Sequence, residues 1–241
     1  CGEKNILFTN NDSAYETAIS LIQKGISVKA IIDNREEVDS KLVNEVEKNN
    51  IKIFKGFTVT DTSGYKRINN ISIMQLSKDG QKVVGSKINL TCDCLGVSGG
   101  WTPAVHLFTQ SGGKLKFSDE DQVFIPNTYP SDQLSIGACK GDLTLDSIFT
   151  NTPNSLKEFL DIKNTEYENI EILSSTNKSK RNIWLLPSDK VLGKTKSFVD
   201  FQNDATAKDI KLALREGFRS IEHVKRYTTT GMGTDQGKLG R

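Results

Sequence analysis

The chain has 241 residues, 36% of them hydrophobic and 26% charged, which suits one large or two modest globular domains with room for a core. Its formal net charge of +2 excludes the strongly basic balance of a protein that binds nucleic acid or a membrane surface. With no run near the ~18 apolar residues of a membrane span and no basic-then-apolar leader, the sequence predicts a soluble, cytoplasmic protein without nucleic-acid or membrane partners.

The beginning of the chain follows the pattern of a βαβ unit. The apolar run Asn5–Thr9 predicts a strand, apolar residues at helical spacing from Ala14 onward predict a helix that stops at Gly25, and Val28–Asp33 predicts a second strand. In a dinucleotide fold, an acid at the position of Asp33 accepts hydrogen bonds from the adenine ribose hydroxyls and favours NAD over NADP.

The turn between this first strand and helix departs from the dinucleotide fingerprint. Thr9, Asn11 and Ala14 stand where Gly-x-Gly-x-x-Gly/Ala is expected, so only the last position matches. Asn enters left-handed conformations readily, and the helix N-terminus still offers amides to an anion. Two interpretations stay open: a dinucleotide site with Asn11 and Asp33 as contacts, or a degenerate Rossmann unit with a structural role.

The next segments predict a second repeat and an antiparallel meander. A helix over 36–49 and a strand over 51–54 complete a βαβαβ pattern, and strands over 57–60, 67–76 and 83–95 follow, separated by turn signals. This order is the usual crossover in flavoproteins with two dinucleotide domains. Cys92 and Cys94 lie one residue apart on the last strand and point to opposite faces, so small structural thiols are expected there rather than a disulfide.

The remainder offers little chemistry. The polar region from Thr152 to Lys196 has no assignable function, although 182–187 reads as a strand. Thr206 and Asp209 form an approximate capping box for a helix, and Ser220 is expected to cap the next one, with apolar residues facing inward. The inward residues of that second helix are predicted to be Ile221, Val224 and Tyr227.

Neither histidine has partners for catalysis. No Ser/His/Asp set, carboxylate pair or phosphate loop can be assembled, and the glycine-rich stretch Gly231–Gly237 lacks the Lys-Ser/Thr ending of a phosphate loop. His106 is predicted to be a hydrogen-bonded structural residue, with a place facing a flavin or a partner left open. His223 is predicted to lie on a solvated or interface face.

Several separated segments carry a distinctive order of residues. They are Cys94–Leu107 (CLGVSGGWTPAVHL), Ser135–Gly141 (SIGACKG), Phe198–Thr206, Arg226–Thr229 and Gly231–Lys238. Together they resemble the alpha subunit of heterotetrameric sarcosine oxidase, and the resemblance extends over essentially the whole chain. Members of that family are larger, with an additional dinucleotide-binding half before this region and a folate-binding domain after it, so the chain is expected to be a fragment.

The resemblance implies an α/β architecture. The fold is expected to be a Rossmann-like FAD/NAD(P)-binding fold of the pyridine-nucleotide-disulfide reductase type, with an antiparallel meander and a small C-terminal helical module. Residues 1–97 correspond to an inserted NAD(P)-binding-like domain and residues 98–150 to the returning half of the outer FAD/NAD-binding-like domain. Residues 151–196 correspond to a linker and residues 197–241 to the helical module that leads to the folate-binding domain.

The resemblance also implies cofactors and partners. NAD is expected in the outer domain of the intact subunit, against the returning segment that contains Gly137, Ala138, Leu143 and Leu145. FMN is expected at the interface between the alpha and beta subunits, FAD on the beta subunit, and tetrahydrofolate in the domain this chain lacks. The partners are the beta, gamma and delta subunits, and this chain is expected to have no catalytic residue of its own.

An iron–sulfur cluster is not expected in the helical module. Cluster binding needs four thiolates, and no cysteine follows Cys139. Where related dehydrogenases place cysteines, this chain has Val199, Phe201, Asp235 and Gly240. No metal site is expected.

Three functions follow. The first is a fragment of a sarcosine oxidase complex that oxidatively demethylates sarcosine to glycine while tetrahydrofolate accepts the one-carbon unit, with this chain contributing dinucleotide binding and scaffolding but inactive in isolation. The second is a non-catalytic scaffold or interaction module. The third is a standalone NAD-dependent flavoprotein reductase, which requires an intact glycine loop.

Overall fold

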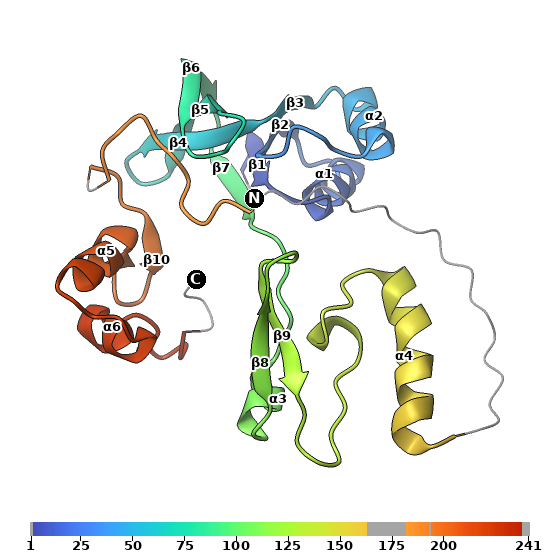
Figure 1. Cartoon of the computed structure of the whole chain (residues 1–241). Helices are drawn as coiled ribbons and strands as arrows, with labels where there is room; N and C mark the ends of the chain where they lie inside the picture. The colour runs from blue at the N-terminus through green and yellow to red at the C-terminus, as the bar shows by residue number, and fades with distance from the viewer. Residues whose placement is uncertain (1, 163–181, 193, 238–241) are drawn as a thin grey trace. The chain divides into compact units, whose positions relative to one another are not determined.

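The computed structural model describes residues 2–162, 182–192 and 194–237 (Figure 1). The chain divides into two compact units. The first comprises Cys1–Ile6, Gly56–Leu95 and Ile183–Arg241, and the second comprises Leu7–Lys55 and Gly96–Asn182. The first half of the chain contains β1 (Asn5–Thr9), α1 (Ser13–Gln23), β2 (Val28–Asp33), α2 (Ser40–Lys48), β3 (Lys52–Lys55), β4 (Phe57–Gly64), β5 (Ile68–Leu76), β6 (Val83–Thr91) and β7 (Cys94–Ser98). The remaining elements are α3 (His106–Gln110), β8 (Lys114–Ser118), β9 (Val123–Thr128), the 3₁₀ turn η1 (Gly137–Cys139), α4 (Leu145–Leu160), β10 (Phe198–Asp200), β11 (Ala205–Thr206), α5 (Ala207–Arg215) and α6 (Ile221–Thr228).

A four-stranded sheet carries the predicted βαβαβ pattern. Its strand order is β3-β2-β1-β7, and β2 pairs with β3 in parallel from Ala30 opposite Lys52 to Asp33 opposite Lys55. All five residues of β1 are buried, as is usual for a strand of a parallel sheet in an α/β fold. The Rossmann-like architecture predicted from the alternating strand and helix signals is therefore confirmed.

Both helices of this region pack apolar residues onto the sheet. Tyr15 and Ala18 of α1, Ile31 of β2 and Val46 of α2 are all fully buried in one cluster. The helix predicted from residue 36 begins four residues later because Asp39 is its N-cap, where the carboxylate accepts the Lys41 N–H at 2.7 Å.

The meander forms its own antiparallel sheet in the order β4-β5-β6, as predicted. The single strand expected over 83–95 is two strands, since β6 ends at Thr91 and β7 joins the parallel sheet. Asp93 lies between them, and its carboxylate accepts the N–H groups of Glu3 at 2.9 Å and Lys4 at 2.8 Å. Cys92 and Cys94 are free thiols, and burial raises the pKa of Cys92.

Residues 182–187 form no strand, contrary to the sequence expectation. The segment after them is held to the meander by polar contacts. Ser188 Oγ donates to the Thr60 carbonyl at 3.4 Å, Lys190 pairs with Asp61, and Lys87 pairs with Asp189 at 2.9 Å. These side-chain contacts connect residues 188–190, which follow the apolar run, to the meander.

Replacing Lys190 with Met is expected to raise the pKa of Asp61. The hydrogen bond and the charge of Lys190 hold the pKa of that carboxyl below its ordinary value of 3.8. A carboxylate-detected NMR titration of the variant should therefore move Asp61 towards 3.8, whereas Lys66→Met, at an exposed site on the same meander, should leave it in place. An unchanged Asp61 pKa in Lys190→Met would mean that the 188–190 segment does not rest on β4.

The C-terminal module consists of the β10–β11 ribbon with α5 and α6. The predicted capping box is confirmed: the Thr206 N–H and hydroxyl both contact Asp209 Oδ2, at 2.8 and 2.7 Å. Ser220 is the N-cap of α6, as predicted, but only one of the three inward residues is buried. Val224 faces the module interior with Thr228, one turn further on, while Ile221 is 80% and Tyr227 45% exposed. The buried stripe of this short helix therefore follows the i, i+4 pair 224 and 228.

Asp200 connects the ribbon to the loop after α6. Its carboxylate accepts the Gly231 N–H at 2.7 Å, the Gln202 N–H at 2.8 Å, and the Asn203 N–H and side-chain amide at 3.2 and 3.1 Å. These donors, the Gly231 N–H first, lower the pKa of Asp200 below 3.8. The ionised carboxylate thus holds the 229–237 loop in place.

Lowering the pH is expected to release the 229–237 loop from Asp200. Because the folded pKa of Asp200 is depressed, its stabilisation is complete above about pH 4 and is lost as the pH falls through the folded pKa. The Gly231 amide resonance should shift with this transition, and Asp200→Asn should abolish the step. Asp204→Asn, a change at an exposed position in the same ribbon, should retain the pH-dependent shift of the Gly231 resonance. If that shift persisted in Asp200→Asn, a carboxylate other than Asp200 would hold the loop.

Candidate functional site

The sequence places its candidate site residues in two regions of the second unit. Asn11 lies in the β1–α1 turn and Asp33 at the end of β2, whereas Gly137, Ala138, Leu143 and Leu145 lie around η1 and the start of α4. The structure joins the first two through a single polar network. The other four lie on a separate segment and are described after it.

The β1–α1 turn is closed by its own side chains. Thr9 Oγ1 accepts the Asn11 N–H at 3.1 Å and donates to the Asn11 carbonyl at 3.0 Å. Asn11 Oδ1 accepts the Ser13 N–H at 3.2 Å and also contacts the Ser13 hydroxyl. The Asn11 amide donates to the carbonyl and hydroxyl of Ser98 at 3.2 and 3.0 Å, which fixes the turn against β7. Side-chain hydrogen bonds therefore stabilise this tight turn, which in the fingerprint loop depends on glycine residues.

The first turn of α1 also has internal acceptors. The Asp12 carbonyl accepts the N–H groups of Tyr15 at 2.9 Å and Glu16 at 3.4 Å, and the Ser13 N–H is taken by Asn11. Asp12 is the N-cap residue, and its carboxylate lies at the positive end of the helix dipole. The position where a dinucleotide fold receives a pyrophosphate thus carries a protein carboxylate.

Asp33 is fully buried, and both of its oxygens accept hydrogen bonds from the protein. Oδ1 accepts the Arg35 N–H at 2.8 Å and Arg35 Nε at 3.1 Å. Oδ2 accepts the Tyr15 hydroxyl at 3.0 Å and Arg35 Nη2 at 2.8 Å. A carboxylate has about four acceptor sites, so these donors fill it.

Arg35 bridges Asp33 to the turn. Its Nη1 pairs with Asp12 Oδ1 at 2.7 Å while Nη2 pairs with Asp33, and only 1% of its side chain is exposed. Burial opposes the charge on Arg35, but its hydrogen bonds and ion pairs with Asp33 and Asp12 outweigh that effect and raise the pKa of the guanidinium. The buried network of Asp12, Tyr15, Asp33 and Arg35 is called the Arg35 cluster below.

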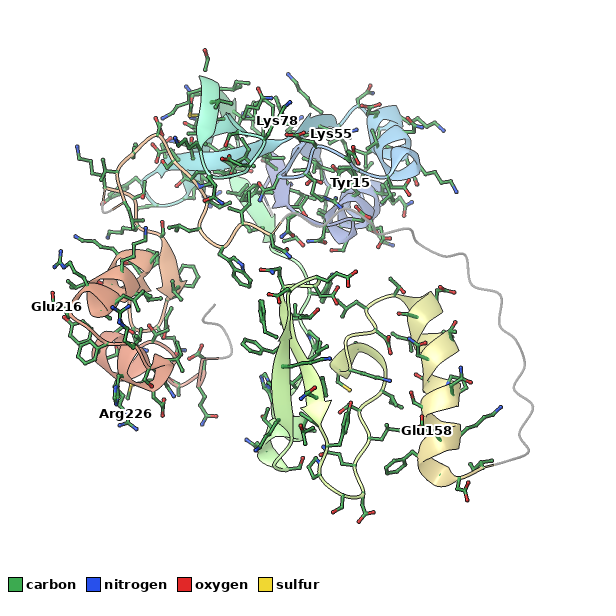
Figure 2. All side chains as sticks on the ribbon, viewed as in Figure 1. Tyr15, Lys55, Lys78, Glu158, Glu216 and Arg226 are labelled. Carbon is green, nitrogen blue, oxygen red and sulfur yellow. The ribbon has the colours of Figure 1, made fainter. Side chains whose placement is uncertain are left out.

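Tyr15 completes the Arg35 cluster from α1, where Figure 2 labels it. Burial raises the pKa of its hydroxyl, and the neighbouring charge of Asp33 raises it further. The hydroxyl therefore stays protonated and donates to Asp33. The sequence alone does not indicate a role for Tyr15 or Asp12, whereas an arginine two residues after the acid at a strand end is a signal that could have indicated Arg35.

A small pocket is lined by residues of β1, α1 and β7. Its volume is about 220 Å³, and its lining residues are Leu7, Phe8, Ala14, Thr17, Gly96, Val97 and Ser98. Ligand sites of drug-sized molecules occupy about 300–1,000 Å³. The pocket is too small to hold a dinucleotide.

The segment around η1 has a different character. Gly137 is buried with a φ of +63°, a left-handed conformation that favours glycine, and its carbonyl accepts the N–H groups of Lys140 at 2.9 Å and Asp142 at 3.2 Å. Ala138 is exposed, Leu143 is 39% exposed and Leu145 is 64% exposed. These side chains are available to a ligand or to another part of a larger protein.

Helix α4 follows this turn and begins in a well-defined way. Thr144 is its N-cap, and Thr144 Oγ1 accepts the Ser147 N–H at 3.2 Å. No side chain of α4 is buried, and Phe149, Phe159 and Leu160 are 47%, 44% and 56% exposed. Figure 1 shows this helix beside η1. These three apolar side chains of α4 are therefore about half exposed.

His106 and His223 are both exposed, at the start of α3 and within α6. In the described ranges, no group of three or more His, Cys, Asp or Glu side chains could hold a metal ion. Across those same residues, no helix has the length and apolar character needed to cross a membrane.

The order and pairing of the strands and helices define the fold class. A parallel sheet with helices after β1 and β2, and a three-stranded antiparallel meander before the returning strand β7, is a Rossmann-like α/β fold of the FAD/NAD(P)-binding type. Solved structures with partial similarity include L-proline dehydrogenase from P. horikoshii, at a TM-score of 0.49 and 14% identity, covering 98% of this chain and 42% of that one. Thioredoxin reductase from T. acidophilum has a TM-score of 0.40 and 18% identity, covering 62% and 53%.

Sequence comparisons show which proteins this chain resembles. Residues 194–241 match the family described as the sarcosine oxidase A3 domain. Sarcosine oxidase subunit alpha from Corynebacterium sp. (strain U-96) is 30% identical over 244 residues, covering 98% of this chain and 25% of the relative. The subunit from Rhizobium meliloti (strain 1021) is 30% identical, covering 99% and 23%. The chain is thus a homologue of the sarcosine oxidase alpha subunit and spans about a quarter of the length of the relatives it matches.

Proposed function

We propose that this chain is part of the alpha subunit of a sarcosine oxidase complex, an oxidoreductase that acts on a CH–NH donor. The observation that carries this proposal is the 30% identity over 98% of the chain, supported by the match of residues 194–241 to the A3 domain. The complex removes two electrons and two hydrogens from the N-methyl amine of sarcosine and passes them to oxygen. Glycine is released, and tetrahydrofolate accepts the one-carbon unit.

The chemistry of such a complex belongs mainly to other chains and domains. In this proposal FAD on the beta subunit would accept the electrons, FMN would bind between the alpha and beta subunits, and a folate-binding domain outside this chain would receive the one-carbon unit. The beta, gamma and delta subunits are the partners, and the complex works in the cytoplasm. This chain contributes nucleotide-fold scaffolding and, in the intact subunit, part of an NAD site.

The residues around η1 fit a dinucleotide in one respect. Gly137 has a left-handed backbone and no side chain that would block a ligand, and Ala138, Leu143 and Leu145 offer exposed apolar surface in the same segment. In the intact subunit, the outer domain would bind NAD as its nucleotide ligand. We assign Gly137 the close backbone contact and the two leucines apolar contacts. The partly exposed apolar residues of α4 fit a position against the other half of that outer domain.

A scaffold role without any nucleotide is the second candidate. The filled acceptor sites of Asp33 and the side-chain-closed β1–α1 turn favour it for the inserted domain. In this alternative the chain serves only to hold the alpha subunit and its partners together.

The test uses the full-length subunit co-expressed with its partner subunits. Sarcosine-dependent oxygen consumption is expected, with bound NAD detectable after denaturation. Gly137→Val should lower the NAD content, whereas Gly112→Val, at another left-handed but exposed glycine, should not. Oxygen consumption without any bound NAD would favour the scaffold role, and no sarcosine-dependent oxygen consumption would contradict the proposed activity.

A further inference from the structure

The Rossmann unit Leu7–Lys55 has a fold in which a dinucleotide normally crosses the carboxyl ends of the strands. Two protein features receive that ligand: amides at the N-terminus of the first helix hold the pyrophosphate, and the acid at the end of the second strand holds the ribose hydroxyls. In this unit those features correspond to the first turn of α1 and to Asp33.

The pyrophosphate position does not fit. A pyrophosphate needs unpaired N–H donors and no negative charge beside them. Here the N–H groups of Ser13 and Tyr15 already have protein acceptors, and the Asp12 carboxylate lies at the same helix end. An incoming phosphate would have to displace these bonds and approach a like charge.

The ribose position does not fit either. Asp33 has no exposed surface, and its two oxygens already accept from the Arg35 N–H, the Arg35 guanidinium and the Tyr15 hydroxyl. A ribose hydroxyl could bind only after Arg35 had moved away. That movement would leave the buried carboxylate of Asp33 without its counter-charge, which is strongly unfavourable.

Arg35 makes both of these interactions in place of a ligand. One end of its guanidinium pairs with Asp33 at the ribose position and the other with Asp12 at the pyrophosphate position, at 2.8 and 2.7 Å. The side chain therefore spans the two places that a dinucleotide would connect. We propose that Leu7–Lys55 closes its own nucleotide site with Arg35 and binds no dinucleotide, so that this Rossmann unit is a structural part of the subunit.

This inference concerns only Leu7–Lys55 and stands whether or not the segment around Gly137 binds NAD. The first experiment is a titration of the ¹⁵N-labelled chain with NAD, followed by amide chemical shifts. No saturable shift is expected at residues 9–17 or 33–36. A saturable shift at these amides would overturn the proposal, whereas shifts confined to residues 135–148 would support it and belong to the outer-domain site.

The second experiment needs no variant, so a failure to fold cannot obscure it. Phenylglyoxal modifies accessible arginines, and mass spectrometry locates the product. Arg226, with 70% of its side chain exposed, should be modified, while Arg35, with 1% exposed, should stay unmodified with or without NAD. Modification of Arg35 under the conditions that modify Arg226, and above all its protection by NAD, would contradict a closed Arg35 cluster.

Discussion

Replacing Arg35 with Met is expected to destabilise the Rossmann unit by about 3–5 kcal/mol, because it leaves a buried carboxylate without its partner. Asp33 would lose three of its side-chain contacts with Arg35, and Asp12 would lose its ion pair. The readout is amide hydrogen exchange of peptides from α1 and β2. These should exchange roughly 10²–10⁴ times faster in the variant, since each ~1.4 kcal/mol changes the opening equilibrium tenfold.

The matched control is Arg215→Met. Arg215 also forms an ion pair, with Glu216 at 3.4 Å, but 75% of its side chain is exposed. Such a pair is worth roughly 0–1 kcal/mol, so exchange in α1 and β2 should be unchanged. If Arg35→Met had no larger effect on those peptides than Arg215→Met, the Arg35 cluster would not hold this unit together.

Truncation of Ile31 to Ala is the second large effect, at about 2–5 kcal/mol for a core residue that leaves a cavity. Ile31 is fully buried on β2 and belongs to the cluster that includes Tyr15 and Ala18 of α1 and Val46 of α2. Because these side chains come from both helices that cover the sheet, the cavity should weaken α1 and α2 together. Hydrogen exchange should therefore accelerate over both helices by a similar factor.

Ile88→Ala provides the comparison for the same chemical change. Ile88 lies on β6 of the meander and is 37% exposed, so much of the truncated side chain is already in contact with water. Exchange in α1 and α2 should remain at the wild-type rate. An equal acceleration in both variants would mean that Ile31 has no special place in the core of the Rossmann unit.

The fold of the first half could be predicted because its signals are local. The apolar runs at β1 and β2, the helical spacing in α1 and the turns of the meander each specify an element within a few residues. The errors came where one side chain decides a boundary. Asp39 starts α2 later than its periodicity suggests, and Asp93 ends β6 before β7 begins.

The site was harder to predict because it depends on contacts between residues that are far apart in sequence. Asp33 alone indicates a ribose contact, and its role is seen only when Tyr15, 18 residues earlier, donates to it and Arg35 folds back over it. The Asn11 interaction with Ser98 spans 87 residues. A missing glycine fingerprint can be read from the sequence, but the arginine that takes the ligand's place requires the structure.

One measurement tests the central claim most directly: hydrogen exchange of the full-length subunit that contains this sequence, with and without NAD. NAD is expected to slow exchange over residues 135–148, around Gly137, and to leave exchange at residues 9–17 and 33–36 unchanged. NAD-dependent protection of the β1–α1 turn and the end of β2, with none around Gly137, would contradict it. The dinucleotide would then occupy the Rossmann unit that Arg35 closes in this structure.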